Sequence, residues 1–500
     1  MRRFALNRRL SLALLLVGVA AVFGSTGGTR VDAANPLNAI QIENAKPGTP
    51  GWDDFSSVAQ QDAINGFGSQ ISVNHGDSID LYVTTTAASF TIDIYRTGWY
   101  GGVGARRVAQ LGSFPGVHQA IPAPDPVTGM VSCENWTKTT TLDIPSDWVS
   151  GVYLARLNAS NGRSSYIFFV VRNDGGTEPI DFQTSVTTYQ AYNEWGHLSL
   201  YNNTGGTAYH YAAATKVSFD RPFDPQDSNG AGQFLYFEYP MIRWMEAQGY
   251  DVTYTTDVDT HTNVNPLTNH RTWLSVGHDE YWSRGMRENV QNAINSGVNA
   301  AFFSANTAYW QIRYEPNSLG VPNRVEVGYK DNSQTNQAPG PDPQWHVNNS
   351  IVTTRWRDPL VNQPENGLIG VMYEDQVQQS YPYVVQNAGN WIYEGTGFTN
   401  GTSIPGIVGY EYDKVWNNGF TPPGVTVLSS SHVVGCCEGS GSSNANSTLY
   451  TAPSGAQVFG SGTIQWAWGL DNYSATYMNA GIQRTTKNIL DAFSAGGPPP

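Results

Sequence analysis

The chain has 500 residues, with 27 lysines and arginines against 41 aspartates and glutamates, for a net charge of −14 at pH 7. This length exceeds what one hydrophobic core usually serves, and the acidic balance excludes the basic surface that nucleic acids and anionic membranes attract. Charged residues make up 14% and hydrophobic residues 40%, which excludes a disordered chain; aromatic residues reach 12%, led by 27 tyrosines. The composition predicts two or three folded domains.

Residues 1–34 have the pattern of a secretory signal peptide. Four arginines precede an apolar run of 14 residues, and small residues follow up to a cleavage site near Ala33 or Ala34. The apolar run is shorter than the ~20 residues that span a bilayer, which disfavours a membrane anchor. Removal of five arginines and Asp32 with this segment changes the net charge from −14 to −18. We expect a secreted protein, extracellular or at the cell surface, with no membrane span after cleavage.

Residues 35–174 have the pattern of a β-domain. Apolar residues alternate with polar ones at Ile79, Leu81 and Val83, and two further apolar runs flank Asn161-Gly162, a strong hairpin signal. Glycine and proline punctuate the rest. We expect an immunoglobulin-like β-sandwich, of the kind that docks onto a catalytic domain or binds a partner.

From residue 175 to 495 the pattern alternates between strands and helices, which predicts a mostly parallel sheet covered by helices. We expect strands at 181–188, 251–256, 272–276, 299–303 and 456–459, and helices at 234–248, from Ser283 to Gly297, and at 479–493. The fold class is therefore α/β plus β. Residues 316–364 are long, polar and rich in asparagine and proline, which favours an insertion or lid.

Polar side chains follow three of these strands, where ligands bind in open α/β sheets. They lie in the segments 189–201, 277–282 and 304–306. No serine elbow, HExxH, phosphate loop or dinucleotide motif is present, and no cysteine stands at a strand-to-helix elbow. Two interpretations remain: acid–base chemistry by His278 with Glu280 or Asp279, or a metal held by oxygen ligands such as Glu280 and tyrosines.

Alternatives without catalysis exist for several of these groups. Asp279 or Glu280 could favour the dipole of the helix after Ser283, and Asn306 could cap the segment that follows it. A separate group, Asp257, Asp259 and His261, could bind a metal, but a solvated acidic loop is the favoured interpretation.

The chain has three cysteines, so at least one of them cannot take part in a disulfide within the chain. An oxidising compartment would allow one disulfide from Cys133 to either Cys436 or Cys437, which leaves one thiol over. No CxxC spacing of a zinc or redox site is present. We expect a structural role for these residues.

Long motifs resemble a known family. They are YQAYNEWGHLSLY, KVSFDRPF, PMIRWMEAQGYDVTYTTDVDTH, LSVGHDEYWS, FFSANTAYWQIRYE, TTRWRDP and GTIQWAWGLD, which cover roughly residues 178–490. Together they resemble the C-terminal domain of the large (beta) subunit of N,N-dimethylformamidase. The resemblance implies a class I glutamine-amidotransferase-like α/β domain behind a β-sandwich, and hydrolysis of a small N-substituted formamide to formate and an amine. It also implies a mononuclear ferric iron bound by two tyrosines and one glutamate.

By this resemblance the metal ligands are Glu280, Tyr201 and Tyr192, with Tyr189 as the second choice for the last. Ferric iron prefers anionic oxygen ligands, and tyrosine ligation of iron has precedent in haem proteins. His197 stands where we expect a glycine, and it would crowd the site or add a ligand.

The same resemblance places His278 and Asn306 beside the metal. His278 or Glu280 would handle the proton passed to the leaving amine, and Asn306 would hydrogen-bond the oxyanion. Asp279 lies between the two assigned residues of its turn.

The sequence therefore predicts a secreted, metal-dependent hydrolase of a small or linear amide. One alternative is a secreted glycan-binding or cell-surface protein that keeps the fold without turnover. Another is an enzyme of this architecture that acts on a polysaccharide or peptidoglycan amide. The expected partner is a small amide substrate, with no nucleic acid, and a glycan or an oligomeric partner stays open.

Overall fold

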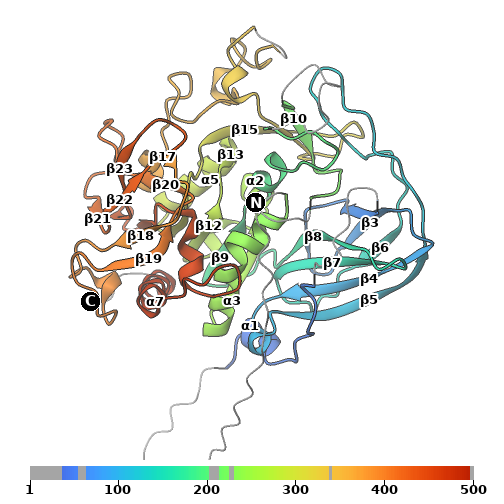
Figure 1. The fold of residues 1–500 in the computed structure, drawn as a ribbon, viewed down its shortest axis with the longest axis horizontal. Helices are drawn as coiled ribbons and strands as arrows, with labels where there is room; N and C mark the ends of the chain where they lie inside the picture. The colour runs from blue at the N-terminus through green and yellow to red at the C-terminus, as the bar shows by residue number, and fades with distance from the viewer. Residues whose placement is uncertain (1–35, 55–62, 202–212, 225–229, 337–339, 496–500) are drawn as a thin grey trace, which may run out of the picture. The chain divides into compact units, whose positions relative to one another are not determined.

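The computed structural model describes residues 36–54, 63–201, 213–224, 230–336 and 340–495. The predicted signal peptide lies outside these residues. Within them, no helix has the length and apolar character that crossing a membrane requires. The chain is mixed α/β, with strands predominating and distributed over several sheets (Figure 1).

Two sheets follow the short helix α1 (Ala39–Asn44). Their strands are β1 (Ile64–Gly68), β2 (Ser72–Asn74), β3 (Ser78–Thr85), β4 (Ser89–Thr97), β5 (Ala105–Pro115), β6 (Thr140–Asp143), β7 (Gly151–Ala159) and β8 (Ser164–Arg172). The orders are β1-β3-β6 and β2-β8-β7-β4-β5 (Figure 1). The alternating residues Ile79 and Leu81 join one core with Ile92 and Phe169 of the other sheet. The hairpin around Asn161-Gly162 is confirmed as β7–β8, while the immunoglobulin-like class stays a prediction.

A seven-stranded sheet carries the second part of the chain. Its order is β11 (Val252–Thr256), β9 (Ile180–Thr184), β12 (Thr272–His278), β14 (Asn299–Ala305), β25 (Gln457–Gly460), β24 (Thr448–Thr451) and β21 (Thr426–Val427). The first five strands are parallel, and the last two pair antiparallel. The predicted mostly parallel sheet is therefore present, while its glutamine-amidotransferase-like class stays a prediction.

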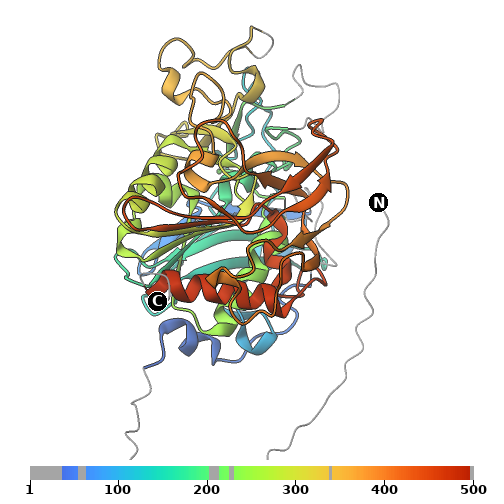
Figure 2. The same ribbon diagram turned by 90° about the vertical axis from the view of Figure 1, so that its left-hand side faces the viewer.

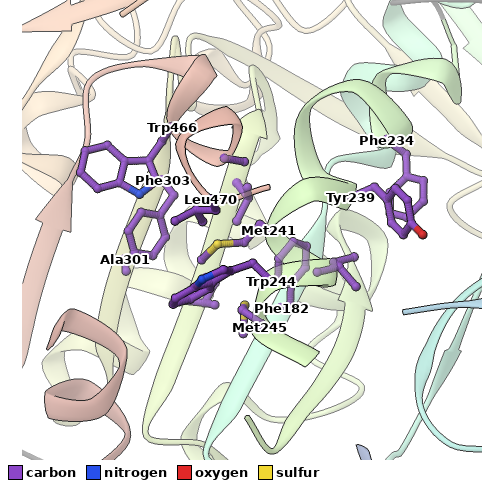
Figure 3. Packing of buried hydrophobic residues seen from close by; sticks show 14 of the residues in the cluster. Phe182, Phe234, Tyr239, Met241, Trp244, Met245, Ala301, Phe303, Trp466 and Leu470 are labelled. Carbon is purple, nitrogen blue, oxygen red and sulfur yellow. The ribbon is translucent and has the colours of Figure 1, made fainter. Parts of the chain in front are cut away.

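Helices pack on this sheet where the sequence placed them. α3 (Tyr239–Gln248) continues a π-helical turn, η3 (Phe234–Glu238), and ends at Gly249, whose φ of +79° suits glycine. The Ser283 side chain accepts the N–H of Met286 and so caps α5 (Arg284–Asn295), as predicted. α7 (Ala480–Ala495), the long red helix of Figure 2, lies against β12. Figure 3 shows the resulting core, in which Met241 and Trp244 of α3 pack near Phe182 and Phe303 of the sheet.

The first predicted strand of this sheet was too long. It ends at Thr184, and Val186–Ala191 form helix α2 instead of strand. Asp257 explains the change, because its carboxylate accepts both the backbone N–H and the hydroxyl of Thr187 in the first turn of the helix. Tyr192 thereby becomes the residue that ends a helix.

The expectation of a solvated acidic loop at Asp257, Asp259 and His261 was wrong. These residues form helix α4 (Asp257–Thr262), and both carboxylates are buried. Asp259 bonds back to Thr256 at the helix start and accepts a hydrogen bond from Ser72 of β2. Its role is to join the two parts of the fold.

The remaining strands form smaller sheets. One has the order β10 (Lys216–Ser218), β16 (Val325–Val327), β15 (Trp310–Glu315) and β13 (Tyr281–Ser283); the two-stranded pairs are β17 (Met372–Gln376) with β20 (Glu411–Lys414), β18 (Tyr381–Val384) with β19 (Ser403–Val408), and β22 (Ser431–Val434) with β23 (Ser442–Ala445). Short helices are η1 (Tyr100–Gly102), η4 (Leu267–Asn269), η5 (Lys330–Asn332), η6 (Asn349–Ile351), α6 (Asn366–Ile369), η7 (Trp391–Tyr393) and η8 (Ile464–Gly469). The predicted insertion at 316–364 thus contributes β16 to a sheet.

All three cysteines are free thiols, so the disulfide that the sequence allowed between Cys133 and Cys436 or Cys437 is not formed. Cys133 is buried beside Val131 and Trp136, whereas Cys436 and Cys437 are exposed in the turn between β22 and β23. The buried thiol therefore packs as a small apolar group.

A buried ion pair joins the β-sandwich to α3. Arg96 of β4 donates from Nη2 to Glu246 Oε1 at 2.8 Å and from Nη1 to Oε2 at 3.1 Å, and both side chains are fully buried. Tyr254 adds a hydrogen bond to Oε1 at 2.9 Å. Apolar residues of β7 and β8 share one core with α3 and the seven-stranded sheet. The two parts therefore stabilise each other.

We expect Arg96→Met to lower the free energy of unfolding by about 3–5 kcal/mol, because it leaves the buried Glu246 carboxylate without its cation. Arg107→Met is the control, since Arg107 pairs with Asp93 at 3.3 Å and its side chain is 44% exposed, so the change should cost at most about 1 kcal/mol. Urea unfolding of the three proteins measures both. Equal midpoints for Arg96→Met and Arg107→Met would contradict the assigned role.

Candidate active site

Two tyrosines and a glutamate meet at the carboxyl end of β12. Tyr192 donates from its hydroxyl to Glu280 Oε2 at 2.8 Å, and Tyr201 donates to Oε1 at 2.8 Å. The two phenol oxygens lie 3.0 Å apart, and the rings stack with centroids at 4.3 Å. Each carboxylate oxygen of the buried Glu280 thus has its own phenol. We call these three residues the oxygen cluster.

Local structure brings the cluster together. Tyr192 ends helix α2, and the N–H of Leu200 bonds to the carbonyl of Ala191, which folds the following loop back so that Tyr201 reaches Tyr192. The N–H of Glu280 donates to Thr188 Oγ1 of the same helix at 2.9 Å. The end of β12 and the end of α2 are therefore fixed to each other.

His278 lies between two carboxylates. Its Nε2 is 3.2 Å from Glu280 Oε2 and 3.1 Å from Glu411 Oε2, and its Nδ1 is 3.2 Å from Gln233 Oε1. Burial by itself would lower the pKa of His278, but Glu411 and Glu280 outweigh it and raise the pKa to about 10. Burial acts against Glu280 too, yet His278 and the other neighbours hold the pKa of Glu280 below its ordinary value. His278 is therefore an imidazolium and Glu280 a carboxylate.

Glu411 is a site residue that sequence reasoning missed. It lies on β20, is 1% exposed, and accepts hydrogen bonds from Gln376 Nε2 at 3.0 Å and from Asn306 Nδ2 at 3.1 Å. No motif or periodicity marks it, because its place depends on the pairing of β20 with β17.

Asn306 follows β14 in a left-handed conformation, with φ of +53°. Its N–H donates to Asp413 Oδ1 at 2.8 Å and its amide to Glu411, so it orients that carboxylate. Its Oδ1 is buried without a hydrogen-bond partner among the described residues. The alternative role as a helix cap does not fit, since the next element is strand β15.

Lys330 lies over the cluster and was also missed. Its Nζ is 3.1 Å from the centroid of the Tyr201 ring and 3.4 Å from the hydroxyl of Tyr281. Burial lowers the pKa of Lys330 to about 8, against the opposing effect of Glu280. The residue belongs to the predicted insertion, so part of that segment covers the oxygen cluster.

The other predicted residues lie elsewhere. Tyr189 donates to Glu238 rather than to Glu280. Asp279 is buried and accepts hydrogen bonds from Ser275 and Trp282, whereas the two phenols bond to Glu280. His197 is exposed, with φ of +74°, and no hydrogen bond in the described parts of the chain joins its side chain to the oxygen cluster.

The oxygen cluster has the donor chemistry of a site for a hard cation. Burial, reinforced by Glu280, raises the pKa of Tyr192 and Tyr201 well above the ordinary range, so that both phenols act as donors. The two phenol oxygens lie 3.0 Å apart and each lies 2.8 Å from one carboxylate oxygen, close enough for them to be neighbouring ligands of one ion. The residues present therefore fit a metal with oxygen ligands, at the cost of two phenolic protons.

Comparison with known proteins places the chain in a family. Residues 91–479 match the family described as "N,N-dimethylformamidase beta subunit-like, C-terminal". The chain therefore belongs to this family, which suggests an amidohydrolase-type function. The match begins within β4, so it includes part of the β-sandwich that the expected limit of about residue 178 left out.

No curated protein matches the chain. Among solved structures, a cycloisomaltooligosaccharide glucanotransferase of Paenibacillus sp., complexed with cycloisomaltoheptaose, matches with a TM-score of 0.17 and 8% sequence identity. The alignment covers 51% of this chain and 57% of that chain, so it spans little more than half of that protein. A TM-score this low does not indicate a shared fold.

Glu238, which accepts the hydroxyl of Tyr189, gives the stability of the fold a pH dependence. Burial raises the pKa of Glu238 from 4.5 to about 8, so the folded protein keeps this proton while the unfolded chain loses it between these values. Its contribution to stability is therefore complete below pH 4.5 and declines as the pH rises toward 8. We expect wild type to lose up to about 1.4 kcal/mol per pH unit relative to Glu238→Gln over this interval. Urea unfolding at several pH values measures the difference, and a constant difference would contradict a protonated Glu238.

Proposed function

We propose that this protein is a secreted, metal-dependent amidohydrolase of a small or linear amide, with a mononuclear ferric iron held by Tyr192, Tyr201 and Glu280. The observation that carries the proposal is the oxygen cluster, in which two phenol oxygens 3.0 Å apart each contact one carboxylate oxygen. Membership of the dimethylformamidase-like family supports amide hydrolysis as the reaction class.

The donor set favours a trivalent ion over a softer or divalent one. Two phenolates and a carboxylate carry three negative charges, and anionic oxygens are the ligands that hard cations prefer. When bound, the ferric ion would polarise the amide carbonyl and make water more acidic. Lys330 over the Tyr201 ring would favour the phenolate form, because an ammonium group stabilises a nearby negative charge.

Hydrolysis of an amide needs one proton removed from water and one delivered to the leaving nitrogen. His278, already an imidazolium, would donate its Nε2 proton to the leaving nitrogen. Glu411 would accept the proton from water and then pass it to the neutral imidazole, because its Oε2 is 3.1 Å from His278 Nε2. Asn306 and Gln376 hold the Glu411 carboxylate in this orientation through its two oxygens.

An aromatic wall adjoins His278 and would contact the substrate. Phe237 and Tyr410 have ring centroids 6.4 and 6.0 Å from the imidazole, and Trp468 stacks on Phe237 at 6.1 Å. Such a wall excludes water and favours an apolar substituent on the amide. The predicted export makes an extracellular amide the expected substrate.

We expect the iron-loaded protein to show a tyrosinate-to-iron charge-transfer band that Tyr192→Phe and Tyr201→Phe each weaken or abolish. Tyr189→Phe is the matched control, because this phenol from the same segment contacts Glu238 and should leave the band unchanged. Visible absorption and metal content of the purified variants measure the effect. Protein from iron-replete cells that contains no metal would contradict the proposal, and loss of the band only in Tyr189→Phe would show that the ligand is wrongly assigned.

Glu411→Gln should separate proton transfer from metal binding. We expect the variant to retain iron and to lower kcat by about 10²–10⁴, the usual contribution of a general acid–base residue. Glu280→Ala should lose iron and activity together, since it removes the ligand itself. The substrate for these assays comes from a screen of formamides, acetamides and N-acetyl sugars for amine release. Retention of full metal in Glu280→Ala would contradict the ligand assignment.

A further inference from the structure

The turn between β22 and β23 carries two adjacent thiols that the proposed reaction does not use. Cys436 and Cys437 are both exposed. The third cysteine, Cys133, is buried in an apolar cluster and is paired with neither of them. Each exposed cysteine therefore has the other as its nearest cysteine in the sequence.

The backbone of this turn is fixed to β17. Asp375 Oδ1 accepts the N–H groups of Cys437 at 3.0 Å and Glu438 at 2.8 Å, and the N–H of Cys436 donates to the carbonyl of Gln376 at 2.9 Å. Gly435 lies so close that an added Cβ would be 2.3 Å from Asp375 Oδ2. The main chain faces β17, and the two thiols are left accessible to small molecules.

We propose that Cys436 and Cys437 form a reversible redox modification site, at which a small-molecule disulfide oxidises the two thiols to a vicinal disulfide. One cysteine thiolate attacks the small disulfide and releases its first thiol, which leaves a mixed disulfide on the protein. The neighbouring cysteine, once deprotonated, attacks that mixed disulfide and releases the second thiol. The two protein sulfurs are oxidised, the small disulfide is reduced to two thiols, and no other reactant is needed.

Geometry makes this disulfide reversible. Adjacent Cα atoms across a trans peptide are about 3.8 Å apart, less than the roughly 4.4–6.8 Å that unstrained disulfides span. Strained and exposed disulfides are more easily reduced than structural ones. Slight burial, together with the neighbouring Cys437 thiol, raises the pKa of Cys436 to about 11, so the reaction should be faster in alkaline solution.

Ring formation would also disturb the attachment of the turn to β17. Closing the ring has to rotate the peptide between the two cysteines. In the reduced protein the N–H of Cys437 donates to Asp375, and the N–H of Cys436 donates to the carbonyl of Gln376. The Gln376 side chain donates to Glu411, so the turn lies two contacts away from the candidate site. The modification itself does not rest on the proposed function.

The test uses the full chain, reduced and then incubated with glutathione disulfide, followed by alkylation of the remaining thiols and peptide mass spectrometry. We expect the peptide with both cysteines to lose two hydrogen atoms and to resist alkylation, and dithiothreitol to reverse both changes. Cys437→Ser should instead keep a glutathione adduct on Cys436, because the resolving thiol is missing. Cys133→Ser is the matched control and should still form the ring.

Hydrogen exchange gives a second measurement. We expect oxidation to speed exchange of the backbone amides of residues 436–440, since their acceptors on β17 are displaced. Stable glutathione adducts on wild type, a bridge to Cys133 or a disulfide between two chains would each overturn the proposal. Unchanged exchange in the ring-closed protein would overturn the coupling to β17.

Discussion

The buried carboxylate of Glu280 is the constraint around which the second part of the chain is organised. An ionised carboxylate in a protein interior is costly unless hydrogen bonds and opposite charge surround it. Its partners come from separate places: Tyr192 from the end of α2, Tyr201 from the next loop, and His278 from β12 itself. Convergence of these segments at one strand end both stabilises the charge and creates the cluster of oxygens.

Sequence reasoning located this strand end but not everything around it. His278 and Glu280 could be predicted because they stand at the carboxyl end of an apolar strand in a parallel sheet and just after it, a rule that depends on local pattern alone. The sequence could not decide between Tyr189 and Tyr192, because the decision depends on where β9 ends and α2 begins. Asp257, from another segment, determines that position through its bonds to Thr187. Glu411 was beyond reach for the same reason: only the β17–β20 pairing places it beside His278.

The sequence pattern also could not show how far the β-sandwich and the α/β part depend on each other. Composition changes near residue 175, yet the two parts share a core, and the buried pair of Arg96 and Glu246 crosses between them. The family match starts at residue 91, inside the sandwich, which agrees with a unit larger than the α/β sheet. A change in sequence pattern marks a change in secondary structure, and contacts across it decide whether the parts are independent.

The π-helical turn η3 before α3 has a consequence for helical phase. Each residue of an α-helix turns the chain by about 100°, so the wider turn of η3 offsets the residues before it from those after it. Gln233, before the turn, faces His278, whereas Trp244 and Met245, after it, face the core. Deletion of one residue within Phe234–Glu238 would restore a regular helix and force a choice between these two alignments. The irregular turn thus lets one continuous helical segment serve the candidate site at one end and the hydrophobic core at the other.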